Sequence, residues 1–157
     1  MKKLLIILSC FICFILSGCS NSSKYETKFT YKVIKDSNFI SIIAEDTKNG
    51  INICIMNSTN DVIEIDWNSS NLGGSSIFMS GQKYADAGSI LPSTVIPPYG
   101  YTTKFLTRAN GVYFSEFWGE WKIKDIEYPT TLILKIICNG KIEFEVIELN
   151  IYKISTI

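Results

Sequence analysis

Two long β-patterned segments near the end of the chain are joined by the dipeptide Asn139-Gly140. Residues 131–138 and 141–152 are rich in Ile, Leu, Val, Phe and Thr, and most of these side chains favour strands. An Asn-Gly pair tolerates the positive φ that a type I′ turn needs at both of its central positions. The two segments therefore predict an antiparallel hairpin with a two-residue loop.

The same kind of pattern recurs along the chain from residue 29 onward. Short runs of Ile, Val, Phe, Tyr and Thr are separated by clusters of Asn, Asp, Gly and Ser, and no segment has a convincing amphipathic helical pattern. About eight or nine strands at this spacing predict an all-β fold, an antiparallel immunoglobulin-like β-sandwich, with a small β-barrel as the alternative. Besides the C-terminal hairpin, we expect strands at residues 29–33, 39–44, 51–56, 62–67, 102–107 and 112–118, with brief candidates at 77–79 and 94–96.

A hairpin is also expected around residues 57–61, which read Asn-Ser-Thr-Asn-Asp and favour a turn. The strands on either side would then pair with each other. In the second of them, alternation places Ile63 and Ile65 on one face, and Trp67 continues that row toward the interior. A second Asn-Gly pair, at residues 110–111, suits a tight turn between its two flanking strands.

The cysteines test the immunoglobulin comparison. Cys54, Trp67 and Cys138 follow the Cys, Trp, Cys order of immunoglobulin domains, in which the two cysteines form a disulfide. Strand alternation argues against this bond. Cys54 is on the face of its strand opposite to that of its isoleucine neighbours, whereas Cys138 is on the same face as the leucines of its own strand. We therefore expect two separate thiols, with the disulfide as the alternative.

The N-terminus has a basic and then an apolar segment. Lys2 and Lys3 precede an apolar run at residues 4–16, which is shorter than the about 20 residues that a transmembrane helix needs. Basic residues, an apolar stretch and small residues before a cleavage point are typical of a secretory signal peptide. We expect residues 1–18 to be removed from the mature protein.

Residues 16–19 read Leu-Ser-Gly-Cys, which resembles the lipobox of bacterial lipoproteins. The resemblance implies that Cys19 becomes the new N-terminus and carries the lipid. Residues 19–28 would then form a lipidated, polar tether, and residues 29–157 a single β-sandwich domain. Two or three acyl chains hold a protein on a membrane stably. The expected location is an extracytoplasmic, lipid-anchored membrane surface of a bacterial cell envelope.

Four further segments resemble those of small bacterial envelope lipoproteins of unassigned function. They are Asn-Ser-Thr at 57–59, Ile-Glu-Ile-Asp-Trp-Asn at 63–68, Gly-Gln-Lys-Tyr at 81–84 and Pro-Ser-Thr-Val-Ile-Pro-Pro at 92–98. Together they cover less than half of the mature chain. Because they are hairpin and loop features, the resemblance implies a fold and a location and assigns no functional residue.

Composition narrows the possible functions. The chain has 15 basic and 15 acidic residues, and Lys2 and Lys3 leave with the signal peptide, so the mature protein has 13 and 15. This balance, without a basic cluster, argues against nucleic acid as a partner. The absence of His excludes Ser-His-Asp and Cys-His catalysis and His-ligated zinc. Since nucleotide motifs are absent and Asp61, Asp66 and Asp86 are too scattered for a calcium loop, no cofactor or metal is expected.

Residues 116–121 contain two carboxylates and three aromatic rings, a mixture that can stack on sugars and bind their hydroxyls. Glu116 and Glu120 also provide the pair of carboxylates that a glycoside hydrolase needs. The structural alternative is that the rings fill the core while both carboxylates are solvated. Strand alternation predicts that Trp118 is buried, and that Trp121, beyond the glycine, is the more exposed and a candidate ligand contact.

Three tyrosines in the irregular region are the other candidate ligand contacts: Tyr84, Tyr99 and Tyr101. Exposed tyrosines on loops of a rigid sandwich suit protein binding, and the alternative is that they cover an edge of the sandwich. We expect a binding or assembly module rather than an enzyme, with an envelope protein or a glycan as its partner. The alternative is a carboxylate-dependent envelope glycoside hydrolase or a carbohydrate-binding protein.

Overall fold

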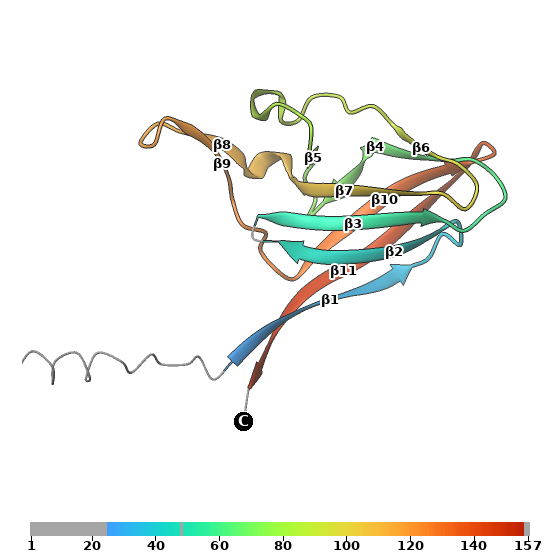
Figure 1. Cartoon of the computed structure of the whole chain (residues 1–157), viewed down its shortest axis with the longest axis horizontal. Coiled ribbons are helices and arrows are strands. Elements are labelled where there is room, and N and C mark those ends of the chain that lie inside the picture. Colours follow the sequence, from blue (N-terminus) through green and yellow to red (C-terminus); the bar gives the residue numbers. More distant parts are fainter. Residues whose placement is uncertain (1–24, 48, 156–157) are drawn as a thin grey trace, which may run out of the picture. The chain divides into compact units, whose positions relative to one another are not determined.

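The computed structural model describes residues 25–47 and 49–155 (Figure 1). The expected signal peptide and Cys19 therefore lie outside the described residues. Residues Lys28–Tyr152 form one compact unit, and the described residues outside it, 25–27 and 153–155, belong to a second unit. The first unit contains the hydrophobic core.

Strands dominate the described part of the chain, and the two remaining elements are short 3₁₀ turns. No helix in these residues is long and apolar enough to cross a membrane. The elements are β1 (Tyr25–Lys35), β2 (Ile40–Thr47), β3 (Gly50–Asn57), β4 (Ile63–Leu72), β5 (Ile77–Met79), η1 (Tyr84–Asp86), β6 (Thr94–Ile96), β7 (Tyr101–Arg108), η2 (Ala109–Gly111), β8 (Val112–Ser115), β9 (Glu120–Ile123), β10 (Thr130–Cys138) and β11 (Lys141–Ser155).

Two large sheets form the layers of the fold. One has the order β1-β11-β10-β4-β6 and the other the order β2-β3-β7-β5, while β8 and β9 pair in a small sheet of their own. The pairings among β2 to β11 are antiparallel. The expected all-β sandwich is therefore confirmed, as two separate layers rather than one closed barrel. The brief strands expected at residues 77–79 and 94–96 are confirmed as β5 and β6, whereas β9 was not expected as a separate strand.

The core lies where the inward side chains of both sheets meet. In β4, Ile63, Ile65 and Trp67 are buried in one row, as alternation predicted. Trp67 donates its indole N–H to the Thr94 hydroxyl at 2.8 Å, which satisfies the polar atom of a buried ring. The two sheets supply most other buried side chains in the same alternating way, including Ile51, Ile53, Ile55, Leu106, Leu132, Leu134, Ile136, Ile147 and Leu149.

The C-terminal hairpin is confirmed. Cys138 pairs with Lys141, so the loop between β10 and β11 has two residues. The φ angles of Asn139 and Gly140 are 49° and 76°, so both central residues have the positive φ of a type I′ turn.

The cysteine prediction is also confirmed. Cys54 and Cys138 are both free thiols. Cys138 is buried in the core, whereas Cys54 is half-buried on the other face of its strand, between buried isoleucines. The two cysteines follow the alternation of their own strands, and the immunoglobulin-type disulfide is not formed.

The hairpin expected around residues 57–61 is wrong. β3 pairs with β2 and β7, whereas β4 pairs with β10 and β6 in the other sheet. The segment crosses between the sheets, and the buried Asn57 holds it there by donating its amide to the carbonyls of Asp61, Ile96 and Pro97. Turn-forming residues indicate that the chain reverses, but they do not specify which sheet the next strand joins.

The tight turn expected at residues 110–111 is wrong for the same reason. Asn110 and Gly111 belong to the 3₁₀ turn η2, and the flanking strands do not pair with each other. β7 lies in a large sheet, and β8 pairs with β9 instead. The turn η2 thus directs the chain out of the sandwich and into a separate hairpin.

Candidate functional site

The β8–β9 hairpin follows η2 and forms a separate two-stranded sheet beyond the end of β7 (Figure 1). Two hydrogen bonds hold its base. Lys124 donates its backbone N–H to the Gly111 carbonyl at 2.9 Å, and the Asn49 side-chain amide donates to the Ile123 carbonyl at 3.0 Å. The second bond ties the hairpin to the connection between β2 and β3, so the hairpin is attached to the sandwich by more than its own chain.

A row of four aromatic rings runs from the sandwich onto one face of this hairpin. Phe78 in β5 is buried, and Tyr84 in η1 stacks on it with ring centroids 5.5 Å apart. Trp121 in β9 stacks on Tyr84 at 6.4 Å. Phe114, the partner of Trp121 in β8, meets it edge to face at 5.6 Å. The row therefore consists of three partly exposed rings and one buried ring, Phe78, which joins it to the sandwich.

The hairpin tip, residues 116–119, exposes two further rings. Phe117 is 85% exposed and Trp118 is 65% exposed, and the two meet edge to face at 4.9 Å. Lys122 lies with its Nζ 4.7 Å from the centre of the Trp118 ring and pairs with the carboxylate of Glu120 at 3.4 Å. The exposed rings of the row and the tip together form what we call the hairpin surface: Tyr84, Phe114, Phe117, Trp118 and Trp121.

The predictions for the two tryptophans need correction. Trp118 was expected to be buried and Trp121 to be the more exposed, but Trp118 is exposed and Trp121, at 41%, is the less exposed of the two. The reason is that β8 ends at Ser115, so strand alternation does not extend as far as Trp118. The core alternative for these rings is wrong too, since Phe117 is also exposed.

The structure separates the three candidate tyrosines. Tyr84 joins Trp121 in the hairpin surface, and by stacking on Phe78 it also covers an edge of the sandwich, as the alternative proposed. Tyr99 lies in the turn between β6 and β7, and Tyr101 is the first residue of β7. Both are exposed, at the opposite end of β7 from the hairpin. The Tyr99 hydroxyl there donates to the side-chain oxygen of Asn60.

The two carboxylates of the aromatic segment lie on exposed positions of the hairpin. Glu120 is paired with Lys122, and Glu116 is in the tip. Neither of two pockets in the domain contains these residues or a pair of carboxylates: one is lined by residues that include Arg108 and Glu127, and the other contains no acidic residue. In the described residues, no group of three His, Cys, Asp or Glu side chains could hold a metal ion.

Sequence reasoning missed Phe78 and Phe114 as members of the site. Phe114 and Trp121 are equally far from the tip along the chain, as paired residues of a hairpin are. This signal was missed because β9 has only four residues, too few for an alternating pattern to identify it as a strand. The contact of Phe78 with Tyr84 joins a strand to a loop, and no periodicity predicts such a contact.

The fold and the site define this protein as an all-β sandwich that carries an exposed aromatic hairpin. No protein-family model matches the chain, and a search of curated proteins finds no significant match. The function therefore has to be inferred from the residues of this chain.

Proposed function

We propose that this protein is a lipid-anchored, extracytoplasmic binding or assembly module of a bacterial cell envelope, and that the hairpin surface contacts a partner protein. The observation that carries the proposal is the exposure of five aromatic side chains on one hairpin and its adjoining loop. Exposed aromatic rings that gather at one end of a protein are candidate interaction sites, and Trp and Tyr are enriched among the residues that dominate binding energy.

A glycan is the alternative partner, because aromatic rings with nearby carboxylates also bind sugars. Stacking on a sugar requires an unobstructed ring face. On the hairpin surface, Tyr84 stacks on two other rings, Phe114 stands edge-on to Trp121, and Lys122 lies over Trp118. These neighbours favour a partner that surrounds the rings, as an apolar cleft of a protein does.

The proposed location rests on the N-terminal sequence. The resemblance of residues 16–19 to a lipobox supports acylation of Cys19. Strand β1 begins at Tyr25, so the tether that follows Cys19 is residues 20–24, and at about 3.5 Å per residue its reach is no more than about 20 Å. The partner would then be another component of the same envelope.

Metabolic labelling tests the anchor. A fatty-acid analogue should label the wild-type chain in cells and should not label Cys19→Ser. Cys54→Ser is the control. Cys54 lies in strand β3, far from the lipobox in the sequence, so this variant should be labelled like the wild type. Labelling of Cys19→Ser at the wild-type level would contradict the anchor.

Site-specific crosslinking tests the partner. A photo-crosslinking amino acid at position 117 of the full-length chain, in its native envelope, should give a discrete adduct. Adding Trp118→Ser or Trp121→Ser should reduce its yield about tenfold, which corresponds to about 1.4 kcal/mol of binding energy. Tyr101→Ser should leave the yield unchanged, since Tyr101 is more exposed than either tryptophan, at 73%, but lies at the other end of β7.

Two outcomes would overturn the proposal. An adduct whose yield is the same in both Trp variants would show that the hairpin surface does not select the partner. An adduct whose added mass is removed by glycan-degrading enzymes would show that the partner is a glycan.

A further inference from the structure

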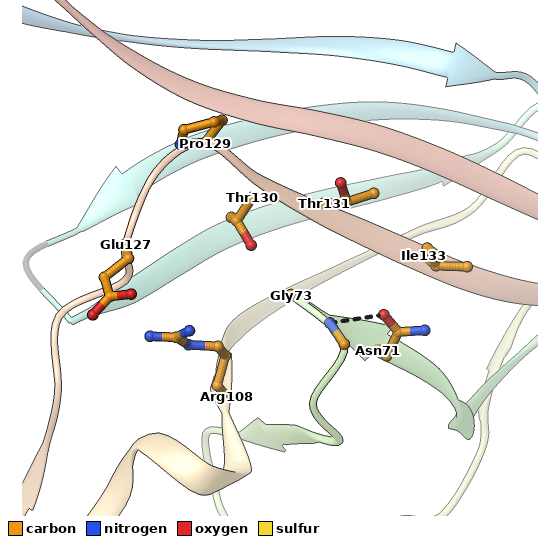
Figure 2. A pocket seen from close by; sticks show the side chains of 9 residues that line it. Asn71, Gly73, Arg108, Glu127, Pro129, Thr130, Thr131 and Ile133 are labelled. Atoms are coloured by element: carbon orange, nitrogen blue, oxygen red, sulfur yellow. Dashed lines mark hydrogen bonds between the residues drawn. The ribbon is translucent and has the colours of Figure 1, made fainter.

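A pocket of about 530 Å³ lies apart from the hairpin surface, between the end of β7, the start of β10 and the turn that follows β4 (Figure 2). This volume is within the range of about 300–1,000 Å³ that is typical of small-molecule sites. Two oppositely charged side chains, Arg108 and Glu127, line it together with Gly73 and Thr130.

Arg108 is the only arginine of the chain and the last residue of β7. It is half-buried, and within the part of the chain that the structure describes it forms no ion pair. An arginine guanidinium presents its N–H donors in a planar fork that matches the two oxygens of a carboxylate. The pocket therefore contains a cation that is suited to a carboxylate and that no described residue neutralises by contact.

Glu127 comes from the segment that precedes β10. Figure 2 shows the carboxylate of Glu127 and the guanidinium of Arg108 pointing toward one another from two sides of the pocket. Since the two groups do not form an ion pair, the pocket presents one charge of each sign. A simple anion would be repelled by Glu127 and a simple cation by Arg108, whereas a ligand with both charges is attracted by both.

Gly73 keeps this pocket open. Its φ is +60°, and an added Cβ would lie 2.7 Å from the Thr130 hydroxyl oxygen and 3.5 Å from Cδ of Arg108. Its backbone N–H donates to the Thr131 carbonyl at 2.8 Å, so the close approach of the two segments is held in place. A larger residue at position 73 would crowd the Thr130 hydroxyl and the stem of Arg108.

We propose that this pocket binds a zwitterionic small molecule of the amino-acid or short-peptide class. Its carboxylate contacts the Arg108 guanidinium, its ammonium contacts the Glu127 carboxylate, and the Thr130 hydroxyl lies beside Arg108 as a third polar partner. The site uses none of the residues of the hairpin surface, so it does not depend on the proposed function.

The single arginine makes a direct test possible. In a ¹H–¹⁵N spectrum of the full-length chain in detergent micelles, Arg108 gives the only arginine Nε–Hε cross-peak. Titration with the dipeptide alanyl-alanine should shift this peak and the amide peak of Gly74, and both shifts should reach a plateau at high dipeptide concentration. Acetate and methylammonium, which each carry one of the two charges, should bind at least about tenfold more weakly, because a hydrogen bond to a charged group contributes about 1.5–3 kcal/mol.

Variants assign the two contacts. Glu127→Gln should weaken the binding of alanyl-alanine at least about tenfold. The same variant should bind acetate as well as the wild type does or better, because the repulsion between Glu127 and the anion is removed. Arg108→Lys should weaken the binding of alanyl-alanine, because lysine keeps the positive charge but lacks the planar, forked donors of the guanidinium. The amide peak of Gly74 measures binding in this variant. Asp125→Asn is the matched control, an exposed acid in the same segment, and should change nothing. The dispersion of the amide peaks shows in the same spectra that each variant is folded.

Two results would overturn the assignment. The first is the absence of a saturable shift with alanyl-alanine. The second is equal binding of acetate and alanyl-alanine, which would make the pocket an anion site. In the first case, a shift of the Arg108 peak in ligand-free Glu127→Gln would show that the two side chains neutralise each other directly.

Discussion

Phe114 and Trp121 stand opposite each other across the β8–β9 ladder, with ring centroids 5.6 Å apart and ring planes at 69° to each other. Edge-to-face contact is a preferred geometry of aromatic pairs, because the positive edge of one ring meets the negative face of the other. A two-stranded hairpin alone is marginally stable in water, so contacts of this kind matter more here than in the interior of a sheet.

A double-mutant cycle should detect this contact. Phe114→Ala, Trp121→Ala and the double variant should give a coupling energy of about 0.5–1.5 kcal/mol in chemical denaturation. The pair Phe114→Ala and Tyr101→Ala is the control, since Tyr101 lies at the far end of β7, and its effects should add within about 0.5 kcal/mol. Equal coupling energies for the two pairs would refute the direct contact.

The tryptophans of the tip and of the core should differ sharply in their effect on stability. Trp118→Ala should lower the free energy of unfolding by less than about 0.5 kcal/mol, because the side chain is exposed. Trp67→Ala should cost about 3–5 kcal/mol, because it leaves a cavity in the core and removes the partner of the Thr94 hydroxyl. Urea denaturation of both variants measures the difference, and a loss above about 2 kcal/mol for Trp118→Ala would be inconsistent with an exposed hairpin tip.

The turn between β10 and β11 can be tested at Gly140, whose φ is +76°. An added Cβ would meet nothing within 4 Å, so the cost of a substitution there comes from the backbone alone. Gly140→Val should destabilise the protein by about 1–3 kcal/mol, because a β-branched residue is strained at positive φ. Gly140→Asn, which tolerates this conformation, should cost clearly less. Equal melting temperatures for the two variants would contradict the turn.

The buried Glu145 should make stability depend on pH. Burial raises its pKa above the usual 4.5, against the opposing effect of the Ser37 backbone N–H, which donates to Oε2 at 2.8 Å. In the window between the usual and the raised pKa, the folded state binds more protons than the unfolded state, so this group contributes stability that is lost as pH rises through that window. Each unit of pKa difference contributes about 1.4 kcal/mol.

The comparison with Glu145→Gln isolates this contribution, since all other titrating groups are shared. Between neutral pH and pH 4.5, the wild type should gain stability relative to Glu145→Gln as the pH falls. Urea denaturation of both proteins across this range gives the difference in the free energy of unfolding. A difference that does not vary with pH would show that the Glu145 pKa is the same in both states.

Much of the secondary structure can be predicted from the sequence, because it depends on residues that are close along the chain. The row Ile63, Ile65 and Trp67, the separate thiols of Cys54 and Cys138, and the turn at residues 139–140 all follow from strand alternation or from the backbone preferences of Asn and Gly. The candidate site could be predicted only in part. Tyr84 and Trp121 were identified singly, whereas their contact and the exposure of Trp118 were not.

The sequence by itself determined that this protein is an all-β sandwich, because apolar alternation at this spacing leaves few other ways to bury the strands. Only the tertiary structure decided which sheet each strand joins, so that residues 57–61 connect two sheets and β8 leaves the sandwich. It also brought Phe78, Tyr84 and Trp121 into one row, and Arg108 and Glu127 to one pocket. Local patterns specify which face of a strand is apolar. The partner of that face depends on how distant segments pack together, and no short stretch of residues encodes that packing.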